Sequence, residues 1–164
     1  MFKYFRQNWS SINSCFLYLF LGTSFVVILT ANFVPSHDVG EHFIHLANSF
    51  LSGNLYFTEQ PGSWMDTSIF RDKHYLPLGP FPAVLLIPFL YVAKFFTFSF
   101  QQGYLNFFLV LGVFYLCFLI AGSLKFSKRD SLYWALAFVF GSMFLGVAFA
   151  PPSWYFSHTI TVFF

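Results

Sequence analysis

Long uncharged apolar runs alternate along this chain with shorter polar connections. A helix of about 20 apolar residues matches the roughly 30 Å hydrocarbon core of a bilayer. Four such runs occur, at about residues 15–34, 81–100, 104–124 and 131–150. A fifth run starts at residue 154 and is still apolar at residue 164. The pattern predicts four membrane-spanning helices and an incomplete fifth, all within a single transmembrane domain over residues 1–164.

The connections between these runs are unequal in length. Three are short turns, at residues 101–103, 125–130 and 151–153, whereas the fourth is a long loop over residues 35–80. That loop holds five of the six acidic residues and four of the five histidines. Loops of this length are usually functional or disordered, and the many aromatic and Leu residues here argue against disorder. We therefore expect the chemistry of the protein to lie in the 35–80 loop.

The start of this loop separates into two faces when it is plotted at 100° per residue. The polar face contains Asp38, Glu41, His42, His45, Asn48, Ser49 and Ser52, and the apolar face contains Val39, Phe43, Ile44, Leu46, Ala47, Phe50 and Leu51. Asp38 and Glu41 have the spacing of a capping box, and Gly53 is a typical helix stop. The pattern predicts an amphipathic helix along the membrane surface, with its polar face toward water.

Composition places the chain among membrane proteins. Of its 164 residues, 57% are hydrophobic and only 9% are charged, and the mean hydropathy is +0.66. Soluble domains carry about a quarter charged residues. The predicted fold class is all-α, a polytopic membrane helix bundle with an amphipathic juxtamembrane helix in a long first loop. We expect a multi-pass protein of the cell membrane, and no basic run suggests a nucleic-acid partner.

The first apolar run differs from a cleaved signal peptide. A cleaved signal peptide has an apolar core of about 7–15 residues followed by a small-x-small site, and the 15–34 run is longer and lacks that site.

Cys15 and Cys117 lie in different runs, without a C-x-x-C motif. The cysteines therefore indicate neither a disulfide framework nor a thiolate metal site.

A basic segment closes the long loop. Arg71, Lys73 and His74 precede a proline-rich entry into the second run. Prolines suit the first turn of a helix, and a helix N-terminus near Lys and Arg suits a phosphate. These three residues are candidate phosphate ligands, and an alternative is that they contact anionic lipid headgroups.

The histidines of the predicted amphipathic helix raise the question of a metal. His42 and His45, with Asp38 or Glu41, offer the nitrogen and oxygen ligands that zinc accepts. Their i,i+3 spacing differs from the H-E-x-x-H arrangement. A solvated polar face without metal is the alternative, and a divalent metal cofactor is left open.

Three stretches resemble integral-membrane GT-C glycosyltransferases, such as the bacterial aminoarabinose transferases and the protein O-mannosyltransferases. S-H-D-V-G-E-H, followed by L-A-N-S-F-L-S-G-N-L, resembles the acidic motif that follows the first span of that family. K-H-Y-L-P-L-G-P-F-P-A-V-L-L resembles the stretch that leads into the second span, and S-W-Y-F-S-H-T-I resembles a serine-histidine motif. The resemblance covers about residues 30–160. The family's motif is often Asp-Glu, whereas here Val39 follows Asp38 and Glu41 stands about one turn on.

The resemblance implies a glycosyltransferase that moves a hexosyl or pentosyl group from a polyprenyl-phosphate carrier to an extracytoplasmic glycan, lipid or protein. Asp38 would be the general base, Glu41 a second catalytic candidate, and Arg71, Lys73 and His74 the phosphate-binding residues. Most members of the family are longer, so we expect this chain to be an N-terminal part that is inactive alone.

Other interpretations stay open. Asp38 is also a common N-cap residue, which would make its role structural. A non-enzymatic multi-pass membrane protein, such as a transporter-like subunit with an interfacial helix, explains the same pattern. An inactive truncated gene product is a third possibility.

Loop charges conflict with the orientation that the family resemblance requires. With the N-terminus inside and all four runs counted as spans, Lys125, Lys128 and Arg129 fall outside together with the 35–80 loop. The positive-inside rule then favours the reverse orientation. One miscounted short span would remove this conflict.

Overall fold

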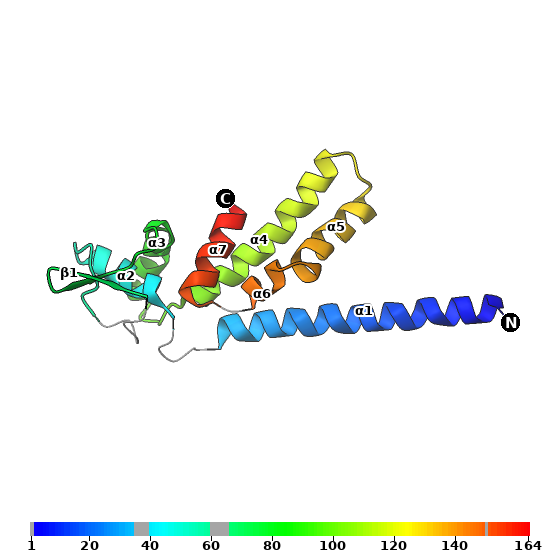
Figure 1. Ribbon diagram of the computed structural model, residues 1–164, viewed down its shortest axis with the longest axis horizontal. Helices are drawn as coiled ribbons and strands as arrows, with labels where there is room; N and C mark the ends of the chain where they lie inside the picture. The colour runs from blue at the N-terminus through cyan, green and yellow to red at the C-terminus, as the bar shows by residue number, and fades with distance from the viewer. Residues whose placement is uncertain (1, 35–39, 60–65, 150) are drawn as a thin grey trace.

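The computed structural model describes residues 2–34, 40–59, 66–149 and 151–164, with side chains described from residue 16 onward. The described residues form seven helices and one two-stranded antiparallel sheet. In chain order these are α1 (Phe2–Phe33), α2 (His42–Leu51), β1 (Ser68–Phe70), β2 (Lys73–Tyr75), α3 (Phe81–Phe95), α4 (Gln102–Ser123), α5 (Lys128–Gly141), α6 (Phe144–Ala148) and α7 (Ser153–Phe163). Figure 1 shows α2, α3 and the sheet gathered beyond the C-terminal end of the long helix α1.

Two helices are long and apolar enough to cross a membrane. They are residues Phe16–Phe33 of α1 and the whole of α4. The predicted run 104–124 is confirmed as a single helix to within two residues, and the predicted run 15–34 is the C-terminal part of α1. The described part of the chain is thus mostly helical, with two candidate membrane spans.

The predicted second span is shorter than expected. Helix α3 starts at Phe81, where Pro80 and Pro82 suit the first turn, but it ends at Phe95 instead of residue 100. Its 15 residues extend about 22 Å, less than the roughly 30 Å of a bilayer core. Thr97 then turns the chain with a φ of 55°. The prediction of a full span over 81–100 is therefore wrong.

The predicted fourth span is interrupted. Helix α5 ends at Gly141 and α6 begins at Phe144. The Ser142 hydroxyl donates to the Phe138 carbonyl at 2.5 Å and accepts from the Phe144 N–H at 3.1 Å, so it bonds to one backbone group of each helix. Gly-Ser pairs are a known cause of sharp helix kinks. The fifth predicted run is observed as α7.

The long loop is built from regular structure. Its strands β1 and β2 pair with Phe70 opposite Lys73, which leaves Arg71 and Asp72 as a two-residue turn. Both turn residues have positive φ, at 49° and 58°, which is typical of a type I′ hairpin. The hairpin corrects the all-α prediction for the described part of the chain.

Helix α2 matches the predicted amphipathic helix at its end but not at its start. The helix begins at His42, with Glu41 in the N-cap position, so it starts later than the predicted capping box implied. Asp38, its other member, lies outside the described residues. Gly53 is confirmed as the stop: its φ is 77°, and its N–H donates to Phe50 O at 2.9 Å while Asn54 N–H donates to Ser49 O at 2.9 Å. These two bonds form a Schellman motif.

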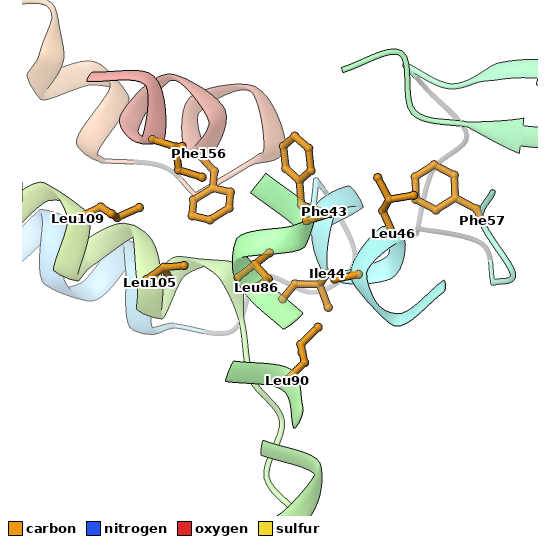
Figure 2. Close-up of a cluster of buried hydrophobic side chains, with 12 residues drawn as sticks. Phe43, Ile44, Leu46, Phe57, Leu86, Leu90, Leu105, Leu109 and Phe156 are labelled. Atoms are coloured by element: carbon orange, nitrogen blue, oxygen red, sulfur yellow. The ribbon is translucent and has the colours of Figure 1, made fainter. Parts of the chain in front are cut away.

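The apolar face of α2 packs on other helices. The surrounding hydrophobic cluster includes Phe43, Ile44, Leu46 and Ala47 of α2, Leu86 and Leu90 of α3, Leu105 and Leu109 of α4, and Phe156 and Ile160 of α7 (Figure 2). His42 and Ser49, which were expected to face water, are also buried, at 6% and 0% exposure. Helix α2 is therefore enclosed by protein on both of these faces, and Ser52 at its end is exposed.

Candidate functional site

The stretch that carries the acidic motif is fixed at one carbonyl oxygen, that of Gly40. This oxygen accepts hydrogen bonds from the Ser153 N–H at 2.8 Å, the Ser153 hydroxyl at 2.5 Å and the Gln102 side-chain amide at 2.8 Å. Ser153 is the first residue of α7 and Gln102 the first residue of α4. We call Gly40, Gln102 and Ser153 the Gly40 clamp. It ties the loop to the N-termini of two helices that are distant in sequence.

Glycine is required at the centre of the clamp for two reasons. The φ of Gly40 is 97°, a conformation that residues with a Cβ rarely adopt. A Cβ at this position would also lie 3.0 Å from the Cβ of Pro152. The close approach of residue 40 to the chain before α7 therefore depends on the absence of a side chain.

The Ser153 hydroxyl also holds the first residue of α2. It accepts a hydrogen bond from the His42 N–H at 3.0 Å, and it lies 3.3 Å from His42 Nδ1. A serine beside a histidine is the pairing used for nucleophilic catalysis. Here, however, the hydroxyl proton is donated to Gly40 O, and Ser153 is only 3% exposed. The Ser153 hydroxyl therefore has a structural role: it links the Gly40 carbonyl to the first residue of α2.

A row of buried amides extends from the clamp toward α1. Asn106, one turn after Gln102, donates to Asn32 Oδ1 at 2.8 Å, and Asn32 donates to the carbonyls of Ile28 and Ala148 at 2.8 and 3.0 Å. The second bond from the Gln102 amide goes to the Pro151 carbonyl. These bonds join the end of α1, the start of α4 and the segment before α7.

Two amide oxygens in this row have no hydrogen-bond partner among the described residues: Gln102 Oε1 and Asn106 Oδ1. Both side chains are fully buried, with 0% exposure. Their orientation is fixed because the amide nitrogen of each already donates to an oxygen of a neighbouring segment. Unpartnered buried acceptors are uncommon in proteins, and an ordered water is the usual partner for such groups.

The structure brings only some of the predicted catalytic and metal-ligating residues to this site. Glu41 and His42 directly follow Gly40, and His45 lies one turn further along α2. Asp38, the principal candidate, lies outside the described residues. Within residues 40–59, 66–149 and 151–164 no group of three or more His, Cys, Asp or Glu side chains is placed to hold a metal ion.

The three candidate phosphate ligands do not converge on one point. Lys73 and His74 are neighbours in β2, and adjacent residues of a strand point to opposite faces. The Lys73 ammonium lies 3.8 Å from the centre of the Tyr56 ring, and His74 Nδ1 lies 3.1 Å from the Thr67 hydroxyl. Arg71 is in the hairpin turn and is exposed. Phosphate binding by these residues stays a prediction.

A second bond connects the long loop to α7. The Trp154 indole N–H donates to Asp66 Oδ2 at 3.0 Å. Trp154 directly follows Ser153 of the clamp, so one end of α7 contacts both the start and the later part of the loop. Neither the clamp nor this bond was visible in the sequence, because the paired residues are separated by 113 and 88 positions.

Known proteins give no independent assignment for this arrangement. No family model matches the chain, and searches of curated proteins and of solved structures found no significant match.

Proposed function

We propose that this protein is a membrane glycosyltransferase of the GT-C type, which moves a sugar from a polyprenyl-phosphate carrier to an extracytoplasmic acceptor. The acceptor hydroxyl attacks the anomeric carbon of the sugar, Asp38 takes the hydroxyl proton as general base, and the polyprenyl phosphate leaves. The proposal rests on the resemblance of the acidic motif and its surroundings to that family.

The Gly40 clamp is the structural observation that supports the proposal. A general base must be held within hydrogen-bond reach of the proton that it removes. The clamp fixes the backbone two residues after Asp38 to the N-termini of α4 and α7. Such an anchor restrains the acidic motif relative to the helices that would enter the bilayer.

The relative direction of α1 and α4 bears on which side of the membrane the motif faces. The end of α1 meets the start of α4 through Asn32 and Asn106, and Phe25 lies 6.2 Å from Phe107. Earlier α1 residues, such as Leu21, share an apolar cavity of about 400 Å³ with later α4 residues, such as Phe114. The two helices are therefore antiparallel. If both cross the membrane, the chain between them starts and ends on the same side.

The antiparallel direction of α1 and α4 removes the conflict between the positive-inside rule and the orientation that the family resemblance requires. The connection after α4 then lies on the same side as the N-terminus, so Lys125, Lys128 and Arg129 join Lys3 and Arg6. Figure 1 shows α4 running from near the end of α1 back in the direction of the N-terminus, at a wide angle to α1. The other side holds Arg71, Lys73 and Lys94. Five basic residues against three favour a cytoplasmic N-terminus, with the acidic motif outside.

A non-enzymatic, transporter-like membrane protein is the second candidate. It is favoured by the buried amides of Asn32, Gln102 and Asn106 in the candidate spans, because polar groups inside a membrane often mark solute pathways.

A sugar-transfer assay with Asp38→Asn separates these candidates. Membranes containing the full-length protein would be incubated with radiolabelled polyprenyl-phosphate hexoses and pentoses, and transfer out of the lipid phase would be counted. We expect Asp38→Asn to lower transfer by about 10²–10⁴-fold at unchanged protein abundance, because general base catalysis contributes that much. Asp72→Asn, an exposed carboxylate in the same loop, is the matched control and should keep activity.

Each other result has a definite meaning. Full transfer by Asp38→Asn would rule out its role as base. Reduced abundance of Asp38→Asn would indicate a structural cap. Absence of transfer by the unmodified protein with every donor would favour the transporter-like candidate.

A further inference from the structure

Helix α3 is apolar on two opposite faces. One face, with Ala83, Leu86 and Leu90, is buried in the cluster around α2. The opposite face is exposed and consists mainly of Phe81, Val84, Tyr91, Val92 and Phe95, with exposures of 49–79%. Lys94 is the one charged residue of the helix. A helix that is hydrophobic all round is normally covered by protein or by lipid.

A row of aromatic rings sets the level of α3 relative to the candidate spans. Phe33, the last residue of α1, lies 5.2 Å from Tyr104 near the start of α4. Tyr104 lies 5.5 Å from Phe100, and Phe100 lies 5.5 Å from Phe89 of α3. Adjacent rings thus connect the middle of α3 to the end of α1 and the start of α4. Tyr and Trp are enriched at the level of the boundary between membrane and water, and Tyr104 of this row is such a residue.

Helix α3 is not placed to cross the bilayer itself. It extends about 22 Å, and only six residues, 96–101, separate its end from the start of α4. If α3 crossed the bilayer, the start of α4 would lie on the same side as the start of α1. Because α1 and α4 are antiparallel, the start of α4 lies instead beside the end of α1. The remaining position for an apolar helix at this level is along the membrane surface.

We propose that α3 lies in the membrane–water interface on the side of the acidic motif, with its exposed face resting on the lipid bilayer. Phe81, Val84 and Phe95 enter the acyl boundary, and Lys94 extends its ammonium to the headgroups. The sequence suggested this role for α2, but the apolar face of α2 is covered by α3, α4 and α7. Helix α3 thereby supports α2 and the Gly40 clamp at headgroup depth. The inference requires α1 and α4 to be membrane spans, as the proposed function does, and it is independent of the sugar chemistry.

Spin labels on single cysteines test this placement. In a Cys15→Ser, Cys117→Ser background, Val92→Cys and Phe95→Cys would be labelled in the full chain and reconstituted into phosphatidylcholine–phosphatidylglycerol vesicles. Leu55→Cys, which is 76% exposed between α2 and β1, is the control for water, and Tyr115→Cys, 59% exposed in the middle of α4, is the control for deep lipid. Accessibility to oxygen and to a water-soluble nickel chelate would be compared, with circular dichroism to verify folding.

We expect the oxygen-to-nickel ratio at positions 92 and 95 to be several-fold above that of Leu55→Cys and below that of Tyr115→Cys. Ratios equal to Leu55→Cys would show that the face is in water and overturn the inference. Ratios equal to Tyr115→Cys would mean that α3 crosses the bilayer, and protection from both reagents would mean that protein covers the face. A water-like ratio at Tyr115→Cys would instead contradict the membrane assignment of α4, whereas loss of sugar transfer alone would leave the placement of α3 unaffected.

Discussion

The side-chain amide of Asn106 in α4 donates a 2.8 Å hydrogen bond to the side-chain oxygen of Asn32 in α1. Both side chains are almost completely buried, at 0% and 1% exposure. Packing between apolar helices has little direction, whereas an amide pair joins two defined positions and so fixes how the helices are aligned. This pair aligns the end of α1 with the start of α4, the helix whose first residue, Gln102, belongs to the Gly40 clamp.

Asn106→Ala should reduce the free energy of unfolding by about 1–3 kcal/mol, because Asn32 Oδ1 is left buried without its donor. Thermal or denaturant unfolding of the purified chain in detergent measures the change. Ser123→Ala is a suitable control, since its hydroxyl is exposed at the other end of α4 and bonds only within the helix. Its effect should stay within about 0.5 kcal/mol. Equal effects of the two variants would contradict a role of the amide pair.

Gly103→Ala should separate α1 from α4, because an added Cβ would overlap the Asn32 carbonyl. Overpacking of this kind costs about 1–3 kcal/mol. Gly122→Ala in the same helix has open space around the new methyl group and should be neutral or slightly stabilising. Unfolding in detergent distinguishes the two, and similar stabilities would argue against close packing at residue 103.

Ser153→Ala should loosen the Gly40 clamp. The His42 N–H loses its acceptor, and Gly40 O loses one of its three donors. Since one hydrogen bond contributes about 0.5–1.5 kcal/mol, hydrogen–deuterium exchange at the His42 amide should become several-fold faster. Ser157→Ala, in the same helix, removes a bond to the Trp154 carbonyl and should leave exchange at His42 unchanged. Unchanged exchange in Ser153→Ala would mean that the clamp does not protect the start of α2.

The sidedness of the two connections can be measured with single cysteines in the background without Cys15 and Cys117. A membrane-impermeant maleimide should label Ser68→Cys in β1 on intact cells, and Lys128→Cys in α5 only after lysis. Both positions are exposed. This pattern is expected if α4 crosses once and α3 does not. Labelling of both on intact cells would contradict a crossing by α4, and the reversed pattern would place the acidic motif inside.

The hydrophobic pattern predicted a helix correctly where one apolar run forms one uninterrupted helix. The 104–124 run is one helix, and Gly53 ends α2 because few other residues adopt its positive φ. The pattern failed at Phe95 and at Gly141, where apolar runs continue but the helix stops. A hydropathy profile does not detect the turn at Thr97. It also does not detect the hydrogen bonds of Ser142 to the two helices on either side of it. The hairpin at Ser68–Tyr75 was missed because each strand has only three residues.

The candidate site was predictable only in part. The acidic motif stands out because carboxylates and imidazoles are rare in this chain, and that signal is local. Ser153 and Gln102 gave no comparable signal, since their role depends on the carbonyl of a glycine more than 60 positions away. The candidate phosphate ligands are close in sequence, yet strand geometry directs Lys73 and His74 to opposite faces.

The sequence by itself determined that most of the chain is helical, that the polar residues gather in one loop, and that α2 has a polar and an apolar face. These properties follow from composition and from the 3.6-residue period, which act over a few neighbouring residues. Only the tertiary structure decided that α1 and α4 are antiparallel, that α3 packs against α2, and that Gly40 is bound to α4 and α7. Those relationships depend on contacts between distant segments, and no local pattern in the sequence records them.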